Sequence, residues 1–128
     1  MACILVIDDN PEFRDILRVH LEANGHRTVL AGNGEQGIAL LERGGIDMVL
    51  TDILMPQRDG VEVLREAKRR WPGLPVIAIS GGGWIGANEL LGMAERLGAD
   101  NILQKPVRRD DLLKAVDDAL KANLKKQA

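Results

Sequence analysis

Five short apolar segments recur at regular spacing along this chain, and sequences with helical periodicity separate them. The segments predict strands at residues 3–7, 27–31, 47–51, 75–79 and 101–104. Strands that alternate with helices favour parallel βαβ units, because a parallel connection is long enough to hold a helix. The pattern therefore predicts an α/β domain with one doubly wound, five-stranded parallel sheet and helices on both of its faces.

The composition of the segments predicts their order in the sheet. Residues 4–7, 48–50 and 76–79 are almost unbroken apolar runs, as expected for central strands that are covered on both faces. Residues 26–31 are more polar and the segment 101–104 is short, which suits the two edges of a sheet. The predicted strand order is therefore 2-1-3-4-5.

Capping residues and apolar periodicity predict five helices. The first begins at Asn10-Pro11, turns Phe13, Ile16, Leu17 and Leu21 toward the sheet, and ends at Asn24-Gly25. The second covers about residues 34–43, and the third opens at Asp59-Gly60 and stops at Trp71-Pro72-Gly73. The fourth carries Leu90, Leu91, Ala94 and Leu97 before Gly98, and the fifth begins near Arg109 or Asp110. Gly34 and Gly37 cost the second helix about 1 kcal/mol each against alanine, so we expect it to be short and weakly stable.

Composition excludes several classes of function. A net charge of −2, with basic residues scattered over the helices, gives no field for direct nucleic-acid binding. No apolar run approaches the length of a membrane span, and Met1-Ala2-Cys3 leads straight into the first strand without the pattern of a signal peptide. We therefore expect one cytoplasmic domain over residues 1–128, without membrane contact, in which Cys3 is a buried apolar residue.

Polar residues follow four of the predicted strands at their carboxyl ends. Asp8 and Asp9 follow the first strand, Asp52 the third, Ser80 the fourth and Lys105 the fifth. Because the carboxyl ends of parallel strands meet at one edge of the sheet, where ligands bind in such folds, these side chains are expected to converge.

Three carboxylates at one edge repel one another, by roughly 4 kcal/mol per pair at about 4 Å and an effective dielectric near 20. A cation relieves that repulsion, and Mg²⁺ fits because it prefers hard oxygen ligands. Asp52 is then the candidate nucleophile for phosphoryl transfer, with the Lys105 ammonium and the Ser80 hydroxyl as partners for phosphoryl oxygens. Each residue alone has an ordinary structural interpretation as a helix cap, a turn residue or a solvated side chain. Their joint occurrence at four strand ends favours a site.

This pattern resembles the receiver domain of two-component response regulators, over essentially the whole chain. The resemblance rests on Asp8-Asp9, on Asp52-Ile53-Leu54-Met55-Pro56 with Asp59-Gly60, on Ser80 and on Lys105-Pro106, in the order and spacing of that family. It implies a flavodoxin-like (βα)5 fold. It also implies that Asp52 accepts a phosphoryl group from a histidine kinase or a histidine phosphotransfer protein, and that a downstream protein reads the phosphorylated surface.

The resemblance further implies a set of site residues. Asp8, Asp9, Asp52 and the backbone carbonyl of Leu54 would bind Mg²⁺ or Mn²⁺. Lys105 and Ser80 would contact the phosphoryl oxygens, and the Lys105–Pro106 bond would be cis. The domain would assist its own phosphorylation and dephosphorylation without being an enzyme for another substrate.

The sequence departs from the family at its switch. Ile102 stands where an aromatic residue usually couples to the hydroxyl residue, and Val107 follows Lys105-Pro106, where an aromatic is also frequent. We therefore hypothesise that Trp84 supplies the aromatic element of the switch, because it lies four residues after Ser80 in a glycine-rich loop.

Several alternatives remain open at this point. The leading interpretation is a stand-alone receiver, and a receiver fragment of a longer regulator, such as a DNA-binding one, would have the same sequence. A phosphatase with an aspartyl nucleophile usually carries a second acid two residues further on, where this chain has Leu54. A flavodoxin-like nucleotide module and a receiver that no longer takes phosphate fit the acidic residues less well.

Overall fold

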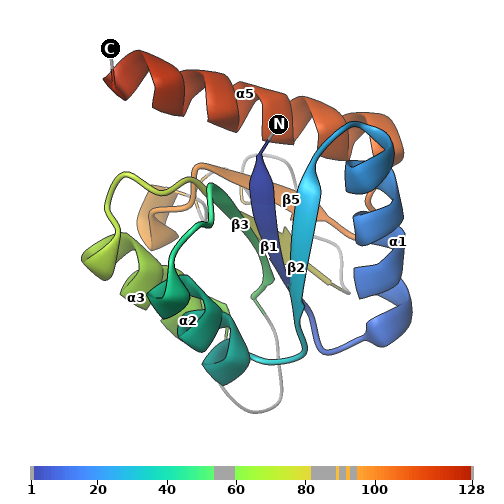
Figure 1. The fold of residues 1–128 in the computed structure, drawn as a ribbon, viewed down its shortest axis with the longest axis horizontal. Helices are drawn as coiled ribbons and strands as arrows, with labels where there is room; N and C mark the ends of the chain where they lie inside the picture. Colours follow the sequence, from blue (N-terminus) through green and yellow to red (C-terminus); the bar gives the residue numbers. More distant parts are fainter. Residues whose placement is uncertain (1, 54–59, 82–88, 90–91, 93–94, 128) are drawn as a thin grey trace.

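A computed structural model of the chain describes residues 2–53, 60–81, 89, 92 and 95–127. Its five strands form one parallel sheet in the order β2-β1-β3-β4-β5 (Figure 1), which confirms the predicted fold and order. The strands are β1 Cys3–Ile7, β2 Arg27–Ala31, β3 Met48–Asp52, β4 Val76–Ser80 and β5 Asn101–Gln104. The two polar or short segments therefore lie at the edges.

Strands β3 and β4 begin and end one residue later than predicted. Asp52 pairs with Ile79, and Ser80 pairs with Gln104, so the hydrogen-bonded ladder runs through both polar residues. Asp52 and Ser80 are therefore the last residues of their strands, not the first residues of the loops that follow. A side chain on a strand is held more firmly than one on a loop, because both neighbouring strands fix its backbone.

Four helices cover the sheet within the described part of the chain: α1 Pro11–Ala23, α2 Gly34–Arg43, α3 Gly60–Arg70 and α5 Arg109–Gln127. Helices α1 and α5 lie on one face and α2 and α3 on the other (Figure 1). Residues 95–97 are helical at the end of the predicted fourth helix, whose Leu90, Leu91 and Ala94 lie outside the described residues. No helix in the described ranges is long and apolar enough to cross a membrane.

The start of α1 has the predicted capping structure. The Asn10 side chain accepts hydrogen bonds from the backbone N–H groups of Glu12 and Phe13, at 2.9 and 3.2 Å, and Pro11 follows at the first helical position. These contacts satisfy backbone donors that have no partner inside the helix. They also fix the first turn of α1 directly beside the end of β1.

Two apolar clusters hold the helices to the sheet. One joins Ile4, Val6 and Leu50 to Leu17 of α1 and Leu112 of α5, and the other joins the opposite faces of β1, β3 and β4 to α2 and α3. Central strands β3 and β4 are buried at every position, which explains their unbroken apolar sequences.

Three expectations about individual residues need correction or extension. Ile16 is 51% exposed, because it lies to the side of the stripe that Phe13, Leu17 and Leu21 turn toward the sheet. Cys3 is only partly buried, because it begins a strand at the amino-terminal edge. Gly37 packs so closely on Ile7 that a Cβ would overlap the Ile7 side chain, so this glycine brings α2 close to the sheet in addition to weakening the helix.

Candidate functional site

The strand register brings the predicted polar residues together at the carboxyl ends of the strands. Ile7 pairs with Thr51, so Asp8 and Asp52 follow side by side on neighbouring strands. Ser80 ends β4 one position after the residue that pairs with Asp52, and its backbone carbonyl accepts a hydrogen bond from the Lys105 N–H at 2.8 Å. The structure therefore brings together Asp8, Asp52, Ser80 and Lys105 as expected, whereas Leu54 and Trp84 lie outside the described residues.

Three carboxylates gather at this edge. Oxygen atoms of Asp8, Asp9 and Asp52 all lie within 4.8 Å of one another. Asp8 is fully buried and Asp52 is 4% exposed, whereas Asp9 is exposed to solvent. Asp8 Oδ1 accepts a hydrogen bond from the Asn10 N–H at 2.8 Å, but Asp8 Oδ2 is buried with no hydrogen-bond partner. The same oxygen lies 3.3 Å from Lys105 Nζ, so an ion pair and no hydrogen bond compensates its burial.

Burial is the main reason why the pKa of Asp8 is raised above its ordinary value of 3.8, and the negative charge of Asp52 raises it further. The hydrogen bond from Asn10 and the positive charge of Lys105 oppose that rise without cancelling it. The site thus holds a carboxylate whose charge the protein alone does not fully compensate.

Lys105 is the cation of the site. Its Nζ lies 3.1 Å from Asp52 Oδ2, to which it donates a hydrogen bond, and 3.3 Å from Asp8 Oδ2. Burial alone would lower the pKa of Lys105, but the hydrogen bond to Asp52 and the charges of Asp8 and Asp52 outweigh it, so this pKa is raised. The ammonium is therefore charged throughout the physiological range. The Lys105–Pro106 bond is cis, as the family resemblance implies.

Lys105 also has two neighbours that the sequence did not reveal as site residues. Its Nζ lies 4.3 Å from the centre of the Phe13 ring, and its side chain runs past the backbone of Gly81. Sequence periodicity assigned Phe13 only to the apolar stripe of the first helix. The available signal was its place in the first turn after the acidic pair, at the same edge as the other site residues.

The residues present fit a hard divalent cation. The donors are carboxylate oxygens, which suit Mg²⁺ better than a soft or tetrahedral metal, and Asp8 Oδ2, which accepts no hydrogen bond, belongs to this cluster. Asp8, Asp9 and Asp52 together could hold such an ion. No other cluster of acidic, histidine or cysteine residues with this capacity occurs in the described ranges.

Comparison with known proteins agrees with this geometry. The family profile of the response regulator receiver domain matches residues 4–117, which is most of the chain. The chain belongs to this family. Receiver domains are the phosphoacceptor domains of two-component signalling, and this receiver domain has the strand order and acidic edge described above.

The relatives differ in length. The receiver domain is 34% identical over 119 residues to the transcriptional regulatory protein GlrR of Escherichia coli, covering 93% of this chain but only 26% of GlrR. It is 32% identical to the chemotaxis protein CheY of Halobacterium salinarum, covering 93% of this chain and 97% of that protein. A receiver domain structure from Clostridium thermocellum superimposes with a TM-score of 0.85 at 32% identity, covering 95% of this chain and 96% of that one.

The family's usual aromatic position is buried in this receiver domain. Ile102 is 8% exposed and packs with Ile53 and Ala78, and Val61 and Ala99 contact the same cluster. Ile102 thus fills an apolar space between β5 and the residue that follows Asp52. The hypothesis that Trp84 replaces the missing aromatic remains untested, since Trp84 lies outside the described residues.

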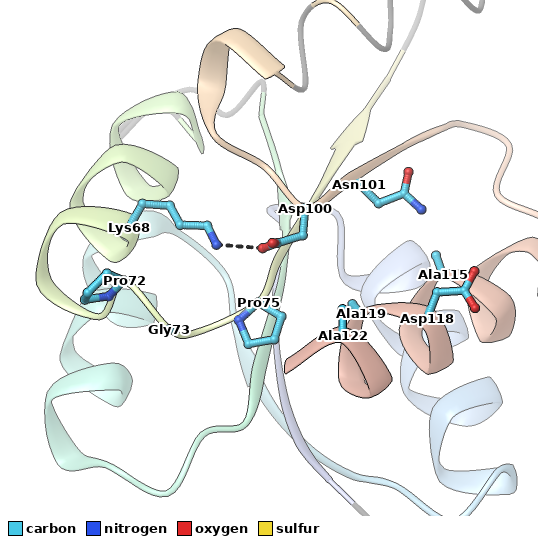
Figure 2. Close-up of a pocket in the computed structure, with 10 residues that line it drawn as sticks. All are labelled: Lys68, Pro72, Gly73, Pro75, Asp100, Asn101, Ala115, Asp118, Ala119 and Ala122. Carbon is cyan, nitrogen blue, oxygen red and sulfur yellow. Dashed lines mark hydrogen bonds and ion pairs between the residues drawn. The ribbon is translucent and has the colours of Figure 1, made fainter. Parts of the chain in front are cut away.

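A separate cavity lies at the amino-terminal ends of β4 and β5. Figure 2 shows Lys68 and Asp100 facing one another beside Pro75, with alanines of α5 along the opposite side. Lys68 Nζ lies 2.6 Å from Asp100 Oδ2, which also accepts a hydrogen bond from the Val76 N–H at 2.7 Å. Lys68 and Asp100 neutralise one another, and their contacts join α3 to the start of β4. We therefore assign them a structural role.

Proposed function

We propose that this receiver domain accepts a phosphoryl group on Asp52 from a phosphohistidine of a histidine kinase or a histidine phosphotransfer protein. One observation carries this proposal. The Asp52 side chain ends a central strand, is only 5% exposed, and lies against the Lys105 ammonium and within 4.8 Å of two other carboxylates. A carboxylate in this setting is positioned as a nucleophile, with a cation beside it for the incoming negative charge.

Asp8, Asp9 and Asp52 would hold Mg²⁺, or Mn²⁺, which has similar ligand preferences, and the backbone carbonyl of Leu54 would complete the protein ligands. When bound, the ion would neutralise phosphoryl oxygens and draw the donor phosphate to Asp52. The cluster favours this role because Asp8 Oδ2, which forms an ion pair with Lys105 but accepts no hydrogen bond, would gain a ligand.

The transfer exchanges one bond to phosphorus for another. An Asp52 carboxylate oxygen attacks the phosphorus of the donor, the P–N bond to the donor imidazole breaks, and the electron pair returns to that imidazole nitrogen. The Lys105 ammonium lies 3.1 Å from Asp52 Oδ2, close enough to shift toward a phosphoryl oxygen as the new bond forms. The buried Ser80 hydroxyl, at the end of the neighbouring strand, would donate to a second phosphoryl oxygen.

The remaining expectations follow from this role. Residues 1–128 would act as one receiver unit in the cytoplasm, where a phosphohistidine donor is available. A downstream protein would read the phosphorylated surface, and a net charge of −2 argues against direct nucleic-acid contact by this unit. The domain would act on its own Asp52 and on no separate substrate.

The test is incubation with a small acyl phosphate and Mg²⁺, followed by intact mass measurement. We expect one phosphate adduct in the wild type, loss of the adduct with EDTA, and no adduct in Asp52→Asn. Asp117→Asn is the matched control, because Asp117 is an exposed carboxylate on α5 outside the acidic cluster, and it should retain the adduct. An adduct of equal yield in Asp52→Asn would contradict the proposal. Rapid donor turnover that never yields an adduct in the wild type would favour the phosphatase alternative.

A further inference from the structure

Among the residues that the structure describes, the Lys105 ammonium lies close to two carboxylates and one aromatic ring. Asp52 Oδ2 and Asp8 Oδ2 lie at 3.1 and 3.3 Å, and the centre of the Phe13 ring lies at 4.3 Å. A lysine ammonium has three N–H donors and no acceptor. The negative face of an aromatic ring attracts such a cation within about 6 Å, and more strongly where water is excluded.

Phe13 is held firmly in this place. It lies in the first turn of α1, its N–H donates to the Asn10 side chain at 3.2 Å, and its ring packs against the apolar cluster beneath α1 and α5. The next residue, Arg14, donates from Nη1 to the backbone carbonyl of Asp8 at 2.7 Å. The ring and the Asp8 carboxylate are therefore tied to the same turn, and they face Lys105 as one unit.

Gly81 lies beside the stem of Lys105. A Cβ at Gly81 would lie 3.3 Å from Lys105 Cδ and 3.7 Å from Nζ, tighter than ordinary contact at the first of these atoms. The absence of a side chain at Gly81 thus leaves room for the lysine to pass. The Phe13 ring lies beside the end of the same side chain.

We propose that Phe13 is a positioning residue, whose ring holds the Lys105 ammonium at the place where it meets the phosphoryl group on Asp52. The proposal rests on the phosphoacceptor function above and extends it to a residue that touches neither phosphate nor metal. A ring suits this task because it attracts the ammonium without competing for it as strongly as a third carboxylate would. The ammonium remains able to exchange Asp8 or Asp52 for a phosphoryl oxygen.

The first measurement is the rate of Asp52 phosphorylation by a small acyl phosphate with Mg²⁺. Phe13→Leu keeps an apolar side chain and removes the ring, and we expect a rate roughly fivefold lower, the scale of a cation–π contact. Phe13→Tyr keeps the ring and should recover most of that loss. Ile16→Ala is the matched control, because Ile16 is an exposed apolar residue of the same helix, and its rate should equal the wild type.

A double-mutant comparison shows whether Phe13 acts through Lys105. In a Lys105→Gln background the ammonium is absent, so Phe13→Leu should cause no further loss of rate. An equal fivefold loss in both backgrounds would overturn the proposal, as would a wild-type rate in Phe13→Leu. A wild type that never forms an adduct would reject the phosphoacceptor function instead, so the two failures are distinguishable.

A structural readout keeps the proposal testable without activity. The chain has one phenylalanine and no tyrosine, so the ring signals of Phe13 are unambiguous in a selectively labelled NMR sample. The ring current should shift the Lys105 ε-methylene protons upfield in the wild type, and Phe13→Leu should abolish that shift. If the ε-methylene protons of Lys105 had ordinary chemical shifts in the folded wild type, the proposed contact would be contradicted.

Discussion

At the scale of single residues, the site is a set of charges that the fold compensates incompletely. Asp8 is fully buried, one of its oxygens has no hydrogen-bond partner, and burial raises its pKa. The sequence could predict that acids meet at this edge, because each follows a predicted strand. It could not predict that Asp8 would be buried and Asp9 exposed, since that depends on how the turn into α1 closes over the sheet.

The raised pKa of Asp8 has a consequence for stability. The unfolded chain ionises this carboxyl near its ordinary pKa of 3.8, whereas the folded protein resists that charge. The group therefore opposes folding at neutral pH, and its penalty disappears as the pH falls below both values. Asp8→Asn removes the charge, and its Oδ1 can still accept from the Asn10 N–H.

We expect Asp8→Asn to have a higher Tm than the wild type at pH 7 without divalent cations, and a smaller advantage near pH 4. Thermal unfolding at the two pH values measures this. Mg²⁺ should raise the Tm of the wild type, because a ligand that binds only the folded state stabilises it, and should have little effect on Asp8→Asn. A lower Tm for Asp8→Asn at pH 7 would show that the ion pair with Lys105 outweighs burial.

At the scale of elements, helix and strand ends place the reactive groups. The ladder continues through Asp52 and Ser80, and the Asn10 cap places Phe13 beside Lys105. Strands and helix starts were predictable because apolar runs, caps and proline act locally. The contact between Phe13 and Lys105 was not, because it joins α1 to the end of β5 through packing that no local pattern encodes.

The start of α3 bears directly on the backbone of Asp52. A Cβ on Gly60 would overlap the Asp52 carbonyl oxygen and the Ile53 backbone, so α3 packs against the strand end at this point. Gly60→Ala should therefore displace the backbone that carries Asp52. We expect a loss of stability of about 1–3 kcal/mol, as for other overpacked sites, together with slower phosphorylation.

Gly73→Ala is the control for this substitution. Gly73 has no neighbouring atom within 4 Å of a Cβ and is exposed, so alanine there should leave both quantities unchanged. Urea unfolding and the phosphorylation rate together measure the effect. Equal stability and rate in Gly60→Ala and the wild type would show that the backbone after Asp52 yields without consequence.

At the scale of the whole molecule, the two ends of the parallel strands carry different arrangements of charge. Three carboxylates and Lys105 gather at the carboxyl ends of the strands, whereas the cavity at the amino-terminal ends (Figure 2) holds a lysine and an aspartate that neutralise each other. The strand order was predictable because the edge strands differ in polarity or length from the central ones. The difference between the charges at the two strand ends could not be predicted, because it depends on side-chain contacts between distant elements.

The central claim is that Asp52, and not a neighbouring acid, carries the phosphoryl group. Borohydride reduces an aspartyl phosphate to homoserine, and peptide mass spectrometry then locates the altered residue. After treatment of the wild type with acyl phosphate and Mg²⁺, we predict homoserine at position 52 and unchanged residues at positions 8 and 9. Homoserine at position 8 or 9, or at no position despite a phosphate adduct, would contradict the account.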